Sequence, residues 1–246
     1  MKKSDFLVSL ALPVIALVGC SGIDNNLDKT SNSHNSVPTK AETACSPPDE
    51  LACAGVDMRY LNLLGISLVG GDFVGADLRG QNLKDADLSK ANFSGANLSS
   101  TNLKYANLSG ANLTGSKMIG ANLRGAILAM ALLEGSDLYG TIFSGQDLKG
   151  QNLTKVDLSY SWMLGLDLTA ANLSGAKLIG AMVDGALSGK AILIGADLEG
   201  ADLRGADLSG TDFSRADLTD AKVSQSQLKM AKLSATKMPD ATIHEP

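Results

Sequence analysis

Carboxylate side chains recur at a spacing of five residues toward the C-terminal end of this 246-residue chain, at Asp197, Asp202, Asp207, Asp212 and Asp217. Two carboxylates on one face can act as general acid and general base, and histidine is the side chain most often used for such proton transfer. The two histidines, His34 and His244, both lie far from the middle of the chain. The aspartates recur because a longer repeat recurs, so the sequence predicts no enzyme, no catalytic residue, no cofactor and no metal site.

The period of five fits neither of the regular secondary structures, whose side-chain periods are about 3.6 and 2. Five residues of helix advance by about 500°, so the apolar positions would spiral around every side. Five is also odd, so successive apolar residues of a flat strand would point to opposite faces. A chain that turns a corner in the same direction every five residues brings all of them inside one coil. Stacked coils of this kind form a solenoid, and internal repeats are its sequence signature.

The apolar phase runs without insertion or deletion from Leu63 to Ile243. Of its 37 positions only Ser188 is not apolar. The residue two before the leucine is small in most repeats and shares its strand face, so both positions point inward. The flanking positions, mostly Asp or Asn before the leucine and Ser, Thr, Lys or Arg after it, point to water. Glycine follows at the corner, where unusual backbone angles are available to it.

The tandem motif A(D/N)LxG, written "ADLEGADLRGADLSG" from residue 196, resembles the pentapeptide-repeat family, and its phase covers about three-quarters of the chain. The resemblance implies an all-β fold, a right-handed quadrilateral β-helix with four repeats per coil and about nine coils, which we assign to residues 58–246. Four repeats per coil place successive aspartates on different sides, which separates their carboxylates.

The first twenty residues, "MKKSDFLVSLALPVIALVGC", resemble the signal peptide of bacterial lipoproteins. Lys2 and Lys3 precede a run of thirteen residues, 6–18, which is too short for a membrane span of about 20 residues but fits an export signal. The resemblance implies cleavage of residues 1–19 and lipidation of Cys20, and several acyl chains on one residue anchor a protein firmly. Because Ser21 is not aspartate, the sorting rule of these lipoproteins implies the outer membrane, facing the periplasm or the surface. The alternative is an ordinary signal peptide in which the cysteine is incidental.

Residues 20–44 are rich in Ser, Asn and Thr and are predicted to form a flexible tether. Residues 45–57 are predicted to cap the first coil. With Cys20 lipidated, Cys45 and Cys53 remain, and export would place them where disulfides form. We expect a structural disulfide between them; metal binding and a redox pair are the alternatives.

Two functions from different classes fit a non-catalytic solenoid. One is DNA mimicry, because the family includes quinolone-resistance proteins that resemble DNA and shield gyrase. From Val56 onward, however, 20 acidic and 17 basic residues give a net charge of only −3, and export would separate the protein from gyrase. The sequence favours the other class, a scaffold that binds an unknown protein partner at the cell envelope, with no nucleic acid.

Outward positions between residues 119 and 194 are unusually apolar. With 20 residues per coil, Ile142, Trp162 and Met182 are predicted to stack on one side, with Leu164 beside Trp162; we call these four residues the candidate partner face. Contiguous exposed apolar surface often marks an interaction site. The alternatives are that decayed repeats tolerate apolar drift or that a coil is locally distorted. The remaining apolar outward residues are Ile119, Ile127, Leu132, Tyr139, Ile179, Leu187, Ile192 and Ile194.

Overall fold

The computed structural model of the protein describes residues 53–60, 63–64, 66–183, 185–186 and 189–245. The chain divides into two units, Met1–Ala52 and Cys53–Pro246, and every described residue belongs to the second. Cys20, Cys45, Leu187 and Ser188 lie outside the described residues, as do the predicted signal peptide and tether. In the described part, no helix combines the length and the apolar character needed to cross a membrane.

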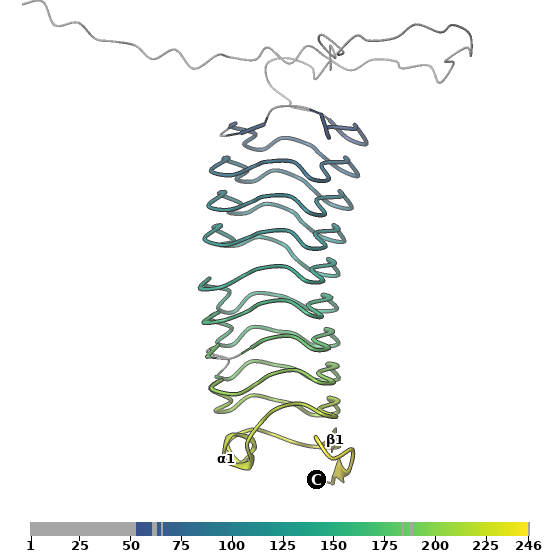
Figure 1. The fold of residues 1–246 in the computed structure, drawn as a ribbon, viewed down its shortest axis with the longest axis vertical. Helices are drawn as coiled ribbons and strands as arrows, with labels where there is room; N and C mark the ends of the chain where they lie inside the picture. The colour runs from purple at the N-terminus through teal and green to yellow at the C-terminus, as the bar shows by residue number, and fades with distance from the viewer. Residues whose placement is uncertain (1–52, 61–62, 65, 184, 187–188, 246) are drawn as a thin grey trace, which may run out of the picture. The chain divides into compact units, whose positions relative to one another are not determined.

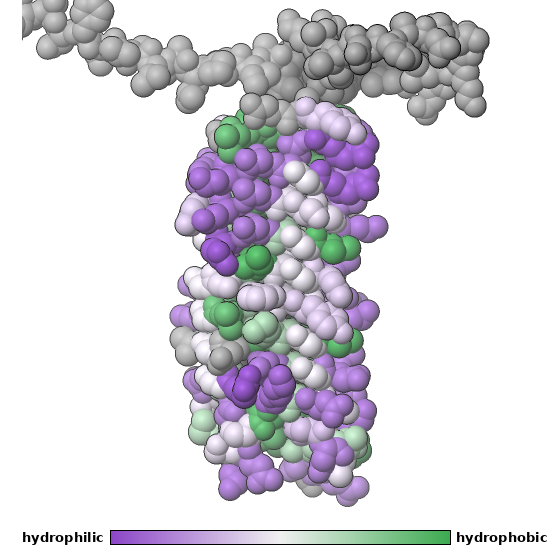
Figure 2. All heavy atoms as spheres, in the orientation of Figure 1, coloured by the Kyte–Doolittle hydropathy of each residue, from purple (hydrophilic) through white to green (hydrophobic). Residues whose placement is uncertain are grey.

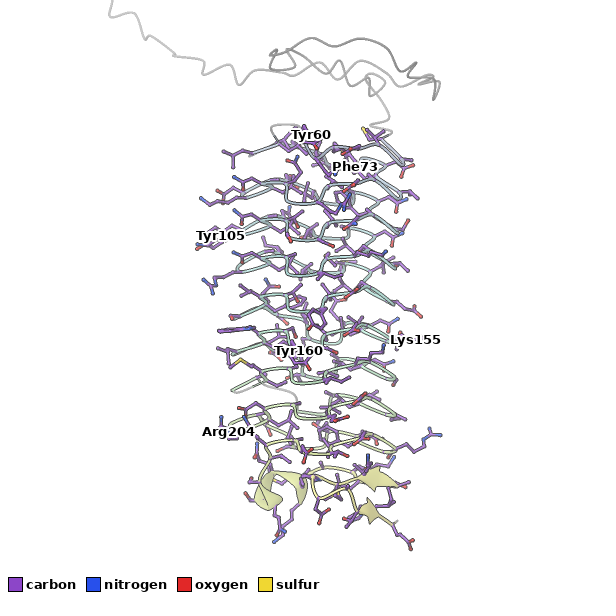
Figure 3. The ribbon with its side chains drawn as sticks, turned by 45° about the vertical axis from the view of Figure 1, so that its right-hand side comes forward. Tyr60, Phe73, Tyr105, Lys155, Tyr160 and Arg204 are labelled. Atoms are coloured by element: carbon purple, nitrogen blue, oxygen red, sulfur yellow. The ribbon has the colours of Figure 1, made fainter. Side chains whose placement is uncertain are left out.

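The second unit is a stack of coils, each 20 residues long (Figure 1). Isolated parallel bridges join residues 20 apart, for example Asn82 to Asn102 and Asn102 to Asn122. Figure 3 shows the same period, since Tyr60 and Tyr160, five coil lengths apart in sequence, lie one below the other near the middle of the view. The predicted coil of four pentapeptides is therefore present, whereas the number of coils stays a prediction because several residues are not described.

The interior is built from the positions that the sequence predicted to point inward. The leucine of each repeat and the small residue two before it are buried almost throughout the described repeats. Where phenylalanine replaces leucine in successive coils, at Phe73 and Phe93, the rings stack with centroids 4.9 Å apart. Strand alternation explains the pattern, because residues i and i+2 share a face.

Hydrogen bonds between coils hold the stack together. The N–H of Leu78 donates to the carbonyl of Asn97 at 2.8 Å, and the N–H of Gly80 donates to the carbonyl of Ser99 at 2.9 Å. Similar pairs recur along most of the stack. The corner residues have positive φ, +63° at Gly115 and +59° at Ser100, a backbone region that costs a non-glycine residue about 1–2 kcal/mol.

The C-terminal end departs from the predicted repeat. A short helix, α1 (Gln225–Leu228), replaces one extended side, and β1 (Thr236–Lys237) pairs antiparallel with β2 (Ile243–His244). The N-terminus of α1 is closed by a capping box between Ser224 and Gln227, in which each side chain bonds the other residue's backbone N–H. This local capping competes with the extended conformation, so the regular coil is interrupted at α1 although the apolar phase continues through it.

Candidate functional site

The polar residue before each leucine has a structural role that the sequence analysis missed. Its side-chain oxygen accepts a hydrogen bond from the backbone N–H two residues later, as from Arg79 to Asp77 Oδ1 at 3.2 Å and from Ser99 to Asn97 Oδ1 at 3.1 Å. Aspartate and asparagine are the side chains that stabilise turns in this way. Their recurrence reflects turn formation, and the preference for these two residues over other polar ones was the available signal.

Acidic side chains of the stack are also paired with nearby cations. At the N-terminal end, Arg59 Nη2 lies 2.6 Å from Asp57 Oδ2, and hydrogen bonds from Arg59 lower the pKa of Asp57 to about 2. At the C-terminal end, Lys232 Nζ lies 2.9 Å from Asp212 Oδ2. Within the described ranges, no group of three or more His, Cys, Asp or Glu side chains is placed to hold a metal ion.

The candidate partner face forms a continuous row in the structure. Parallel bridges join Ile142 to Trp162 and Trp162 to Met182. The Trp162 side chain is 49% exposed, while Ile142, Leu164 and Met182 are partly exposed. The structure thus places these four side chains on the outside of the stack.

The row is apolar only in its middle. The same side carries Asn122 in the preceding coil and Asp202 in the following one. Because Trp162 replaces an Asp or Asn, the N–H of Leu164 lacks the turn acceptor that other repeats provide. Hydrophobic side chains also interrupt the more hydrophilic surface along the stack in the view of Figure 2.

The other outward apolar residues are spread over the remaining sides. Ile127, Leu132 and Ile192 are exposed, but parallel bridges join them to Asn107, Asn112 and Asn172 respectively. None of the three therefore lies in the row of bridged residues that contains Trp162. Tyr139 instead contacts Tyr160, with ring centroids 5.2 Å apart. Cys53 is buried and takes part in a disulfide, whereas its pairing with Cys45 stays a prediction.

Comparisons with known proteins agree with the repeat. The family described as pentapeptide repeats (8 copies) matches residues 82–118, 116–150, 152–187 and 191–229, more than half of the chain. This match points to no enzyme family. A comparison with curated proteins gave no match.

Among solved structures, the chain is similar to HetL, a pentapeptide repeat protein involved in heterocyst differentiation regulation from the cyanobacterium Nostoc sp. strain PCC 7120. The identity is 32%, over 78% of this chain and 92% of HetL, with a TM-score of 0.42. It is also similar to QnrB1, a plasmid-mediated fluoroquinolone resistance protein, at 22% identity over 65% of this chain and 90% of QnrB1, with a TM-score of 0.38. A protein of the Arabidopsis thaliana thylakoid lumen matches at 25% identity over 67% of this chain and 73% of its own, with a TM-score of 0.15. With the 20-residue coils and the family match, the chain belongs to the pentapeptide-repeat family and has its right-handed β-helix solenoid.

Proposed function

We propose that the protein is a non-catalytic scaffold of the bacterial cell envelope, anchored through lipid at Cys20, that binds a protein partner through the candidate partner face. The observation that carries the partner proposal is the half-exposed Trp162 at a position that the repeat gives to a turn-stabilising polar residue. Tryptophan is enriched among the residues that dominate binding energy at protein interfaces.

The stabilising hydrogen bonds that are lost at Ile142, Trp162 and Met182 support a role of these residues in binding a partner. Trp162 gives up the hydrogen bond that Asp or Asn would make to the N–H of Leu164, and such a bond contributes about 0.5–1.5 kcal/mol. Three successive coils make the same replacement, at Ile142, Trp162 and Met182. Their apolar atoms remain in contact with water in the isolated stack, and covering them with a partner would remove that unfavourable exposure.

The charge distribution favours a protein partner over DNA mimicry. A DNA mimic needs long rows of uncompensated negative charge. Here Arg204 Nη2 lies 2.6 Å from Asp202 Oδ2 and Lys237 Nζ lies 2.9 Å from Asp217 Oδ2, so carboxylates of the stack are locally neutralised. Pairs of this kind weaken the field that would imitate a phosphate backbone.

The partner proposal is tested with Trp162→Asp, which restores the polar residue of the repeat. Leu132→Asp is a matched control, since Leu132 occupies the same repeat position on another side and is 56% exposed. Both variants should unfold at temperatures close to that of the wild type. In quantitative crosslinking from membranes of the native host, Trp162→Asp should lose the partner that Leu132→Asp retains. Equal recovery of every partner by both variants would refute the proposed face.

The anchor proposal has its own test. The wild type should incorporate labelled fatty acid and partition into detergent, and Cys20→Ser should do neither. A wild-type protein without lipid would contradict the anchor while leaving the partner experiment unaffected.

A further inference from the structure

Two adjacent sides of the stack share an interruption in the hydrogen bonds between coils. The N–H of Leu123 donates to the carbonyl of Ile142 at 3.0 Å, and the N–H of Gly135 donates to the carbonyl of Thr154 at 3.0 Å. Between these two intact bonds, the described chain offers no acceptor to the backbone N–H groups of Gly125, Leu128, Met130 and Leu133. The bridge from residue 127 to residue 147 is missing as well, although Asn107 pairs with Ile127 and Asp147 pairs with Asp167.

Two glutamines explain the interruption. Gln146 and Gln151 occupy inward positions that most repeats give to a small residue. Each side chain crosses to the preceding coil, where Nε2 of Gln146 donates to the carbonyl of Leu123 and Nε2 of Gln151 donates to that of Leu128 at 3.1 Å. On these two sides, the coil that carries both glutamines is thereby held away from the preceding coil.

A third glutamine supports this cause. Gln81 holds the same repeat position, and its Nε2 donates to the carbonyl of Met58 at 2.6 Å. The usual bonds from the N–H groups of Tyr60 and Leu63 to the following coil are missing there too. Thr141 at the same position bonds within its own coil, to the carbonyl of Leu138 at 2.6 Å, and the coil-to-coil bond of the next residue is intact.

The interruption opens a slot of about 720 Å³ on the surface, within the size range of about 300–1,000 Å³ typical of ligand sites. Ile127 and Met130 line it from one coil, and Asp147 and Lys149 line it from the next. Met130 is 83% exposed, whereas Gln146, which also lines the slot, is only 6% exposed. The Oε1 atom of Gln146 is buried and accepts no hydrogen bond from the described residues.

We propose that this slot binds an extended peptide segment of a partner, which pairs with the open backbone edges. Both edges present donors and acceptors that are unpaired in the described structure. On one coil these are the N–H groups of Leu128 and Met130 with the carbonyl of Ala126, and on the other the N–H of Asp147 with the carbonyls of Asp147 and Lys149. Only another extended backbone offers alternating donors and acceptors at matching spacing, and peptides add to open sheet edges in this way.

The side chains of the slot specify the kind of peptide. Ile127 and Met130 favour an apolar residue beside them. Lys149 Nζ lies 3.0 Å from Asp167 Oδ2, and none of the ion pairs among the described residues involves Asp147. The slot therefore suits an extended peptide in which apolar and basic residues alternate. This inference does not rest on the proposed envelope function or on the candidate partner face.

The probe for the test is an N-acetylated, C-amidated hexapeptide of alternating valine and lysine with a fluorescent label, titrated into the full chain. We expect saturable binding, at least tenfold weaker for the same peptide with alternate backbone nitrogens methylated. Hydrogen exchange of the Leu128 and Met130 amides should slow when the unmethylated peptide is bound. No saturable binding, or equal binding of the methylated peptide, would overturn the proposal.

The protein variants test the cause of the slot. Gln146→Ala combined with Gln151→Ala restores the small inward residues, so the coils should close, the unfolding temperature should rise, and peptide binding should weaken at least tenfold. Gln81→Ala is the matched control and should bind the peptide like the wild type. If the double variant does not fold, Met130→Gly tests the slot instead. This change removes an exposed slot side chain, and glycine readily adopts the φ of +59° found at that corner. Unchanged binding by the folded double variant, or by Met130→Gly, would refute the slot.

Discussion

Replacing Leu153 by aspartate tests the inward direction of the repeat. The Leu153 side chain is fully buried, and the N–H of Leu153 donates to the carbonyl of Asn172 in the following coil at 2.7 Å. The substitution forfeits about 1.5–3 kcal/mol of apolar burial. Burying an unpaired carboxylate adds several kcal/mol more. The total of at least about 5 kcal/mol is comparable with the whole stability of a typical domain, about 5–15 kcal/mol.

We therefore expect Leu153→Asp to abolish cooperative folding at neutral pH, measured by urea unfolding followed by circular dichroism. Burial raises the pKa of a carboxyl, so the folded variant would bind its proton more tightly than the unfolded chain. Its stability should consequently recover in part as the pH falls from 7 toward about 5, in the direction opposite to that of the wild type described below.

The control is the neighbouring outward residue. Asn152 Oδ1 accepts from the N–H of Thr154 at 3.2 Å, and Asn152→Asp keeps this acceptor. The change removes a weak 3.5 Å contact to Glu134 and adds a like charge at the surface, with an expected cost below about 0.5 kcal/mol. Equal damage from the two substitutions, or a wild-type unfolding curve for Leu153→Asp, would refute the inward and outward assignment.

Two further predictions concern the corners and the surface carboxylates. Gly115→Ala should cost about 1–2 kcal/mol in urea unfolding from its φ of +63° alone, because an added Cβ meets open space. Gly125→Ala should cost more, since the Cβ would lie 2.5 Å from the ring of Tyr105; equal costs would show that the ring moves freely. Because hydrogen bonds from Arg59 lower the pKa of Asp57 from 3.8 to about 2, its contribution is complete above pH 4 and is lost on acidification, so the unfolding temperature should fall between about pH 4 and pH 2. A rise in that interval would contradict the pairing.

The coil was predictable because burial imposes it at every repeat. Each inward leucine must avoid water, and no local interaction competes with that requirement along residues 66–183. The outward direction of Trp162 followed from the same phase. By contrast, the turn-stabilising role of residues such as Asp77 depends on the angle of the corner, which the polar character of the position does not reveal. Helix α1 escaped prediction because its capping residues outweigh a phase that continues through it.

The interruption between the coils at Gln146 and Gln151 could not be predicted from the period of the repeat. A period of five describes how a residue sits within its own coil, but Gln146 and Gln151 act on the coil before, 23 residues earlier in the chain. Both glutamines depart from the small residue of most repeats, but the pattern does not show what their longer side chains would reach. Their extra length becomes significant only once the carbonyls of Leu123 and Leu128 lie across from them. Ile142 of the candidate partner face lies on the side of the coil that immediately precedes the side of Gln146. Adjacent sides of one coil therefore depart from the repeat in different ways. A departure at an outward position changes what the surface presents, whereas one at an inward position changes the spacing of the coils.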